Sequence, residues 1–160
     1  TDYKFVVAMA PGLDKSFYDT LLSGYTNVKA VTGKTYDLLM QATAALVTSG
    51  TATLETALFG VPEVVCYKGS AVSYAIAKRV IKIKYISLVN LIMDKPVVKE
   101  LIQHELTVNN VKKELHELLT GKERIEQLQE DYSALKTLLS KGGHASANAA
   151  KAISSFLQNG

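Results

Sequence analysis

The sequence predicts an α/β protein, in which a parallel sheet is flanked by helices and is followed by a helical C-terminal region. Up to about residue 90, short apolar runs alternate with stretches whose apolar residues recur at helical spacing, a pattern typical of parallel βα units. Beyond Asp94 the helical spacing dominates. We expect strand and helix alternation over about 3–93 and a helical region over about 96–158. A chain of 160 residues, 48% of them apolar, can bury one substantial core, so a single domain over 1–160 is expected.

The first half of the chain contains four predicted strands. The first helix is expected to start after Asp14 as its N-cap, and Gly60 is expected to end the helix over about 52–59. A further helix is expected to carry Val72, Ile76, Val80 and Ile83. The predicted strands are Phe5–Met9, Val28–Val31, Ala44–Val47 and Glu63–Tyr67.

The second half contains two amphipathic helices and a final alanine-rich one. Gly142 and Gly143 separate the last helix from the one before it. The last helix places on one side Ala149, Ala152, Ile153 and Phe156. The apolar positions of the two preceding helices are Val108, Val111, Leu115 and Leu118, then Ile125, Leu128, Tyr132, Leu135 and Leu139.

Composition excludes several classes of protein. Cys66 has no partner for an internal disulfide and sits in an apolar strand, so we expect a small core side chain and a reducing, cytoplasmic compartment. No apolar stretch is long enough to span a bilayer and no signal peptide precedes the first strand. A net charge of +3 without a basic, aromatic stripe argues against nucleic acid as a partner. The histidines lack metal-site spacing, so neither a metal nor another cofactor is expected.

The most informative loop follows the third strand, at Ser49, Gly50 and Thr51. Ligands bind beyond the carboxyl ends of parallel strands, and free N–H groups at a helix start favour anions. Glu55 lies about one turn further on the same helix face. A capping box needs Ser or Thr three residues before the glutamate, but that residue is Ala52. A phosphate loop with a carboxylate for ribose hydroxyls is one interpretation; a tight turn and an exposed helix glutamate are the other.

A resemblance decides between these interpretations. Residues 48–55 read TSGTATLE and are followed by ALFGVP, which resembles the nucleotide-sugar motif of GT-B glycosyltransferases. The later segments AKR at 77–79, YISLVNL at 85–91 and VKELIQ at 98–103 are similar, in that order, to lipid-A-disaccharide synthases. The resemblance extends from about Tyr3 to the C-terminus and implies a Rossmann-like sheet, as in the C-terminal domain of a GT-B fold.

The resemblance also implies roles for particular residues. Ser49, Gly50 and Thr51 are expected to meet the diphosphate and Glu55 the ribose. Donor-site neighbours are then Asn90 and Gln103, with Glu100 and the backbone of Ser87 and Leu88 close by. Without the resemblance, Asn90 reads as a turn or cap residue and Gln103 as a solvated helix residue.

The chain departs from the family in two respects. The family's Gly-Ser-Arg phosphate loop is not found in these 160 residues. We also expect the N-terminal acceptor domain, where the catalytic base is expected, to be absent from them. We therefore expect no catalytic residue here, and no turnover by the chain alone.

The implied full reaction transfers 2,3-diacylglucosamine from UDP to 2,3-diacylglucosamine 1-phosphate, giving the β-1,6 lipid A disaccharide and UDP. The implied partners are the UDP-linked donor and, through the absent domain, the lipid acceptor. Peripheral contact with the inner face of the inner membrane is a further expectation. Two interpretations of the basic series Lys78, Arg79, Lys82 and Lys84 stay open: contact with anionic lipid head groups, or a basic helix face exposed to solvent.

Two alternatives to this function stay open. One is an enzyme like the UDP-sugar 2-epimerases, whose motif typically carries a glycine pair and adjacent glutamates. The other is a non-catalytic module that associates through its C-terminal helices. Because the last helix of GT-B folds commonly crosses to the partner half, residues 144–157 are expected to pack incompletely here or to pair with a second copy as a homodimer.

Overall fold

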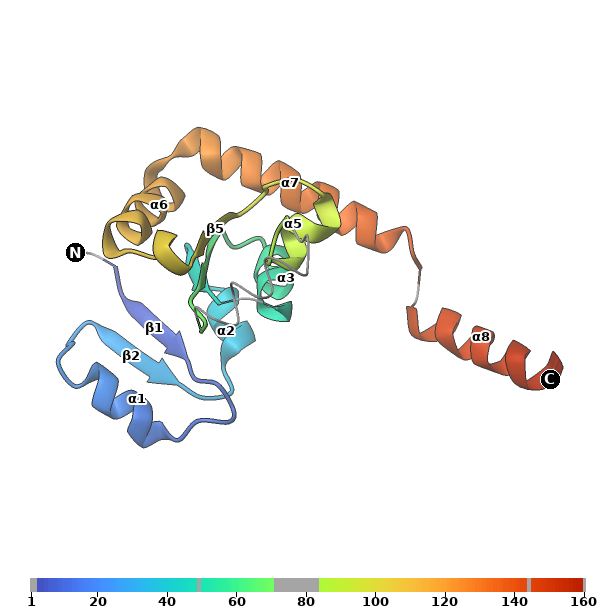
Figure 1. Cartoon of the computed structure of the whole chain (residues 1–160), viewed down its shortest axis with the longest axis horizontal. Helices are drawn as coiled ribbons and strands as arrows, with labels where there is room; N and C mark the ends of the chain where they lie inside the picture. Colours follow the sequence, from blue (N-terminus) through green and yellow to red (C-terminus); the bar gives the residue numbers. More distant parts are fainter. Residues whose placement is uncertain (1–2, 49, 71–83, 144, 160) are drawn as a thin grey trace. The chain divides into compact units, whose positions relative to one another are not determined.

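The computed structural model describes residues 3–48, 50–70, 84–143 and 145–159 (Figure 1). Ser49, the helix expected over about 72–83 and its basic residues Lys78, Arg79 and Lys82 lie outside these ranges. The described chain consists of two compact units, residues 1–43 and 44–160.

The first unit is a βαβα segment with a two-stranded parallel sheet. Phe5 pairs with Val28 and Ala8 with Val31. Asp14 occupies the N-cap position of α1, as predicted, but its side chain makes no cap hydrogen bond. The Tyr18 hydroxyl instead accepts a hydrogen bond from the Ala10 N–H at 2.9 Å, which ties the helix to the preceding turn. The elements are β1 (Phe5–Ala8), α1 (Lys15–Leu22), β2 (Val28–Val31) and α2 (Thr35–Leu39).

The second unit contains a three-stranded parallel sheet in the order β3-β4-β5. Its strands are β3 (Ala45–Val47), β4 (Glu63–Tyr67) and β5 (Lys99–Ile102). Its helices are α3 (Thr51–Leu58), α5 (Leu88–Met93), α6 (Val108–Thr120), α7 (Lys122–Ser140) and α8 (Ala145–Asn159), with a short 3-10 turn, η1 (Gln103–Glu105).

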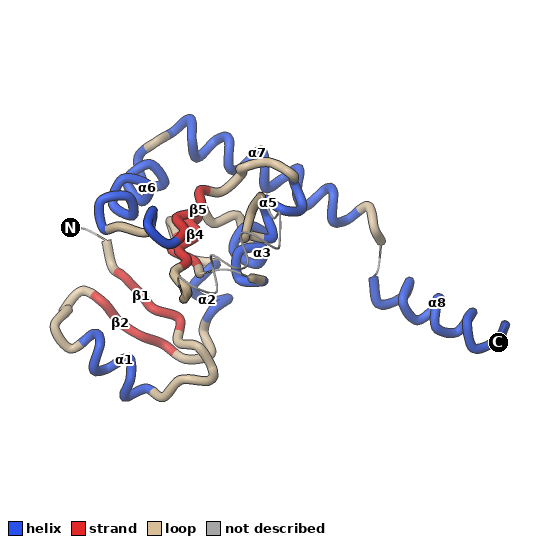
Figure 2. The backbone as a smooth tube through the Cα atoms, in the orientation of Figure 1, coloured by secondary structure: helices blue, strands red, loops and turns tan. Residues whose placement is uncertain are grey.

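The core of this unit surrounds the central strand β4. Val64 and Val65 point to opposite faces of the sheet, and both are fully buried. Helices therefore cover both faces: Figure 2 shows β4 and β5 between α6 on one side and α3 and α5 on the other. The apolar stripes of α6 and α7 supply Leu118, Leu128, Tyr132 and Leu135 to the same core.

These elements confirm the predicted α/β class with parallel strands and flanking helices. Gly60 has φ +77°, a left-handed conformation that favours glycine, and it follows the end of α3 as expected. One expectation is wrong: the region after residue 96 is not helical throughout, because Lys99–Ile102 form β5. Only Leu101 of that strand is fully buried, so its apolar pattern is too short to separate a strand from a helix.

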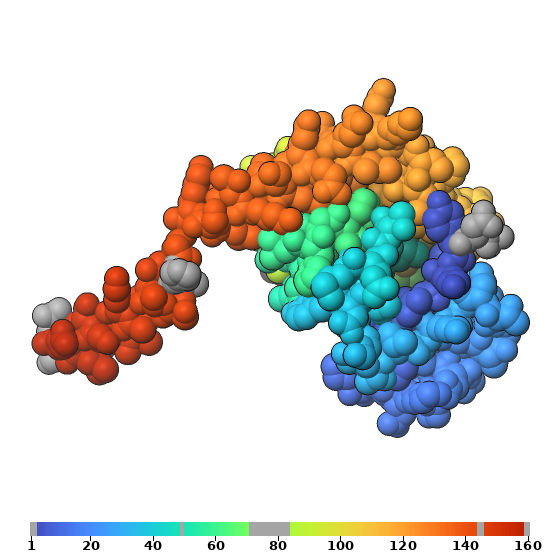
Figure 3. All heavy atoms as spheres, turned by 180° about the vertical axis from the view of Figure 1, so that it is seen from behind, coloured from blue at the N-terminus to red at the C-terminus, as the bar shows by residue number. Residues whose placement is uncertain are grey.

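The side chains of residues 146–158 in α8 are exposed (Figure 3). Phe156 is 79% exposed, although the helix carries the predicted apolar side. This agrees with the expectation that the last helix packs incompletely.

Candidate functional site

The residues singled out by the sequence follow the carboxyl ends of the strands in the second sheet. Val47 of β3 pairs with Val65, and Tyr67 of β4 pairs with Ile102 of β5. Thr48 and Gln103 thus follow β3 and β5, the two strands that flank β4, at the carboxyl edge of the sheet. Ligands of open parallel sheets bind at such an edge, where loops lead into helices.

The loop after β3 adopts a conformation that requires glycine. Gly50 has φ 82° and ψ −151°, which side-chain-bearing residues rarely adopt, and it occupies the N-cap position of α3. Gly50 and Thr51 are exposed. Among the described residues no side chain caps α3, so the first N–H groups of this helix have no side-chain partner there. Ser49, the third predicted residue here, lies outside the described residues.

Glu55 is half-buried on α3, one turn beyond Thr51. Its carboxylate forms no hydrogen bond or ion pair with any residue in the described part of the chain, so it remains available as an acceptor.

A second segment, Ile86–Asn90, lies against this loop. The backbones of Gly50 and Ser87 form an isolated parallel bridge, although they are far apart in the sequence. Ser87 N-caps α5, where its hydroxyl accepts a hydrogen bond from the Asn90 N–H at 3.2 Å. The structure therefore brings together two motifs that the sequence analysis assigned to the same site.

Glu100 holds the start of α5 in place. Its Oε1 accepts hydrogen bonds from the backbone N–H of Ser87 at 2.9 Å and of Ile86 at 3.1 Å. The same oxygen accepts from Asn90 Nδ2 at 2.9 Å. The N–H groups at the start of a helix lack partners within the helix. Just before α5, the Glu100 carboxylate accepts from the N–H groups of Ile86 and of the N-cap Ser87.

Asn90 is almost completely buried, at 1% exposure. Its Nδ2 donates to the Val98 carbonyl at 2.9 Å and its Oδ1 accepts from the Val98 N–H at 2.8 Å. Its amide is thus engaged with the protein, so it positions its neighbours from within the core rather than capping a turn.

Gln103 does not lie in a regular α-helix, so it is not the solvated helix residue that the sequence without the resemblance suggests. It starts η1 with φ 53°, a left-handed conformation that is uncommon for a residue with a side chain. Its Nε2 is buried and has no hydrogen-bond partner among the residues that the structure describes. An unpaired buried donor is costly, so this one calls for a partner that the described residues do not supply.

Sequence reasoning missed Thr53. Its side chain is completely buried; the hydroxyl donates to the Gly50 carbonyl at 2.8 Å and accepts from the Leu88 N–H at 3.2 Å. A threonine within TSGTATLE gives no local sign of this role, because its second partner lies 35 residues further along the chain.

Sequence reasoning also missed a buried carboxyl at the other end of β4. Glu63 is 0% exposed, and burial raises its pKa to about 9. Both its carboxyl oxygens and the Tyr132 hydroxyl lack hydrogen-bond partners in the described ranges. Burial raises the pKa of Tyr132 well above its usual range, and the nearby Glu63 raises it further. This pair lies at the amino end of the strand, away from the candidate site.

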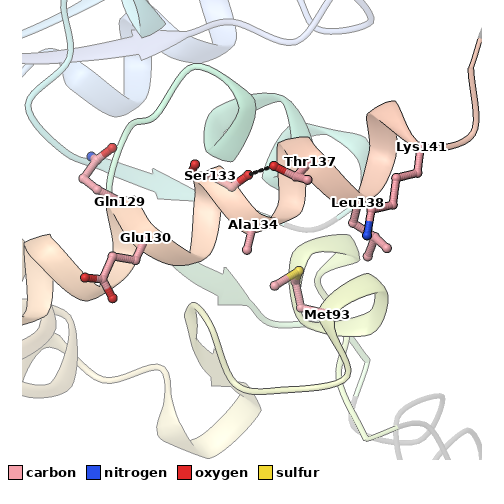
Figure 4. Close-up of a pocket in the computed structure, with 8 residues that line it drawn as sticks. All are labelled: Met93, Gln129, Glu130, Ser133, Ala134, Thr137, Leu138 and Lys141. Atoms are coloured by element: carbon pink, nitrogen blue, oxygen red, sulfur yellow. Dashed lines mark hydrogen bonds between the residues drawn. The ribbon is translucent and has the colours of Figure 1, made fainter.

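Two hollows adjoin the second unit. One, of about 380 Å³, is lined in part by Asn90 and Glu100, together with Arg124 from α7. The other is an open groove of about 880 Å³ along α7 and Met93, lined by no predicted site residue (Figure 4). Only the first of these two hollows touches the hydrogen-bond network of Asn90 and Glu100.

Other kinds of site find no support in the described ranges. No group of three or more His, Cys, Asp or Glu side chains there is arranged to hold a metal ion. None of the helices described is long and apolar enough to cross a membrane. Cys66 packs partly buried against the core, and burial raises the pKa of its thiol, in keeping with a structural side chain.

Comparison with known proteins places the whole of this arrangement in one family. The lipid-A-disaccharide synthetase family matches residues 2–155. The lipid-A-disaccharide synthase of Syntrophus aciditrophicus is 38% identical over 152 residues, which are 94% of this chain and 40% of the relative. That of Psychromonas ingrahamii is 43% identical over 121 residues, 74% of this chain and 32% of the relative. That of Hahella chejuensis is 36% identical over 162 residues, 99% of this chain and 40% of the relative.

The chain thus spans at most about two fifths of the length of these relatives. The matched residues include the Gly50 loop, Glu55, the Ile86–Asn90 segment and Gln103. With these motifs assembled at one edge of a parallel sheet, the chain belongs to the lipid-A-disaccharide synthase family.

Proposed function

We propose that this chain is the donor-binding part of a lipid-A-disaccharide synthase and that it binds the UDP portion of a UDP-linked 2,3-diacylglucosamine. The observation that carries the proposal is the pairing of Gly50 with Ser87, which joins the two family motifs. Family membership favours this transferase over a UDP-sugar 2-epimerase or a non-catalytic module.

The proposed contacts follow from which polar groups the protein leaves unused. Gly50 and Thr51 are exposed at the start of α3, so the Thr51 hydroxyl and the N–H groups there suit a diphosphate. The Glu55 carboxylate suits paired ribose hydroxyls. Gln103 Nε2 is an unpaired donor beside the same edge.

The N–H groups of Ser87 and Leu88 are less suitable, because Glu100 and Thr53 already accept from them. In this proposal Ser87, Leu88, Asn90 and Glu100 shape the site rather than contact phosphate.

The reaction proposed for the whole enzyme transfers the diacylglucosamine to 2,3-diacylglucosamine 1-phosphate, with a β-1,6 linkage and release of UDP. As the bond to UDP breaks, negative charge accumulates on the diphosphate. Donors fixed before the reaction stabilise that charge without reorganising. The Gly50 loop supplies such donors, whereas the base that activates the acceptor hydroxyl is proposed to lie in a different part of the enzyme.

UDP titration of the chain, followed by backbone NMR shifts, tests the proposal. We expect saturable shifts at residues 50–55 and around Gln103. Gln103→Ala should weaken UDP binding. Gln129→Ala, which removes an exposed hydrogen bond to the Gly60 carbonyl beyond the C-terminal end of α3, should not. A folded chain without shifts at these residues in millimolar UDP would contradict the proposal.

A further inference from the structure

The hydroxyl of Thr53 connects the two loops that meet at the candidate site. A threonine hydroxyl has one hydrogen to donate and two lone pairs that accept. In Thr53 the hydrogen is directed to the Gly50 carbonyl, and one lone pair accepts from the Leu88 N–H. Since the side chain is fully buried, water cannot replace either partner.

The first of these bonds fixes the orientation of a peptide group. The Gly50 carbonyl accepts from both the Thr53 N–H, at 3.3 Å, and the Thr53 hydroxyl, at 2.8 Å. The peptide between Gly50 and Thr51 is planar and trans, so its N–H points opposite to its carbonyl. Holding the carbonyl toward α3 therefore turns the Thr51 N–H outward, to the side where an anion would lie.

The second bond sets the distance between this loop and α5. Leu88 is the first residue of α5, and its N–H has no partner within the helix. Glu100 serves the two preceding N–H groups, and Thr53 serves this one. Both α3 and α5 are thereby tied to the same buried hydroxyl.

We propose that Thr53 is a positioning residue for donor binding: its hydroxyl orients the Thr51 N–H and holds the Gly50 loop against the start of α5. This inference rests on the proposed function, because it assumes that the Gly50 loop contacts the UDP diphosphate. Thr53 itself does not touch the ligand.

The chain contains a matched control on the same helix. Thr56 is also buried in α3, and its hydroxyl donates only to the Ala52 carbonyl, at 2.8 Å, within the helix. Thr53→Val and Thr56→Val both replace a buried hydroxyl by a methyl group. Only the first removes a bond between the two loops.

The test compares UDP dissociation constants by NMR titration of the 160-residue chain. We expect Thr53→Val to weaken binding about tenfold. Thr56→Val and Thr53→Ser, which keeps the hydroxyl, should each bind within about twofold of the natural chain. Urea unfolding of every variant shows whether a loss of affinity merely follows a loss of stability.

A second pair of variants tests the same link from the α5 side, and keeps the inference testable if Thr53→Val does not fold. Leu88→Pro removes the N–H that Thr53 accepts; proline is favoured at a first helical position, and the extended Ser87 (φ −80°, ψ 142°) suits a residue before proline. Leu88→Ala keeps the N–H. We expect Leu88→Pro to weaken UDP binding as Thr53→Val does, and Leu88→Ala to bind more tightly than Leu88→Pro.

The outcomes separate this inference from the function on which it rests. If the natural chain shows no UDP response at residues 50–55, the proposed function fails and the inference fails with it. If the natural chain binds UDP but Thr53→Val matches Thr56→Val, or Leu88→Pro matches Leu88→Ala, the inference alone is overturned.

Discussion

The side chain of Asn90 and the backbone of Val98 are joined by two hydrogen bonds, one in each direction. The Asn90 amide thus makes with Val98, the residue just before β5, the two backbone hydrogen bonds that a neighbouring strand would otherwise make. Its remaining N–H donates to Glu100, which in turn holds Ile86 and Ser87. The buried Asn90 amide therefore links α5 to Val98, which precedes β5, and to the Glu100 carboxylate of β5.

Loss of this amide should destabilise the fold. Asn90→Ala leaves the Val98 N–H and carbonyl unpaired in the core, and we expect the free energy of unfolding to fall by about 2 to 4 kcal/mol. Urea unfolding measures it. Asn110→Ala is the control, because it removes one partly buried side-chain bond, to the Glu105 carbonyl, and should cost about 1 kcal/mol. Equal losses in the two variants would argue against the linking role of Asn90.

Glu63 should make the protein less stable as the pH rises. Burial raises its pKa from 4.5 to about 9, so between these values the folded state keeps a proton that the unfolded state releases. The favourable contribution of this proton is present below pH 4.5 and is lost as the pH rises toward 9. The expected slope is about 1.4 kcal/mol per pH unit where Glu63 alone titrates.

Glu63→Gln should remove most of this slope and stabilise the protein at pH 8, because the amide has no proton to lose there. Unfolding free energies at pH 5, 6.5 and 8 give the comparison. Glu126→Gln, an exposed change on α7, should keep the natural slope. The same slope in all three proteins would refute a buried, protonated Glu63.

Glu55 should affect ligand affinity without affecting stability. Its carboxylate has no partner in the described part of the chain, so Glu55→Gln removes no bond from the folded protein that the structure shows. We expect an unfolding free energy within about 0.5 kcal/mol of the natural value and UDP binding weakened about five- to tenfold. Calorimetric titration with UDP, with Glu126→Gln as the control, makes the comparison; unchanged affinity in Glu55→Gln would remove the ribose contact from the proposal.

The last helix should contribute little to the stability of the unit that precedes it. Since residues 146–158 are exposed, deleting residues 145–160 should change the free energy of unfolding by less than about 1 kcal/mol. Leu135→Ala, in the fully buried part of α7, should cost about 2 to 4 kcal/mol. Hydrogen exchange should be fast along α8. Strong protection of this helix in a monomeric sample would contradict the expectation.

The sequence predicts the fold best where the apolar pattern and the breaker residues agree. Val28–Val31 and Glu63–Tyr67 are strands with the predicted bounds, and Gly60 ends α3 as expected. The sequence did not predict β5, because this edge strand has only four residues and the first two, Lys99 and Glu100, are charged. Such a short mixed run fits helix and strand equally well.

The candidate site could be located from the sequence, but the tasks of its residues could not. Loop position and helix spacing indicate Gly50 and Glu55, whereas Asn90 is assigned to the same site only through the resemblance to the family. Whether a polar side chain faces a ligand or a neighbouring backbone depends on contacts between distant segments. Thr53 and Glu100 show this: each acts on residues 86–88, and neither contact follows from local pattern.

All the strand pairings described are parallel, which has a consequence for how the chain acquires its structure. The paired residues Phe5 and Val28, Ala45 and Glu63, and Val64 and Lys99 are separated by long crossovers, so none of these pairings can begin as a hairpin. Each crossover must close against chain entropy before its strands gain from contact, which slows folding. We expect refolding on the millisecond-to-second scale that is typical of high contact order. We also expect the segments around Gly50 and Ser87 to come into contact only after β4 has paired with both β3 and β5.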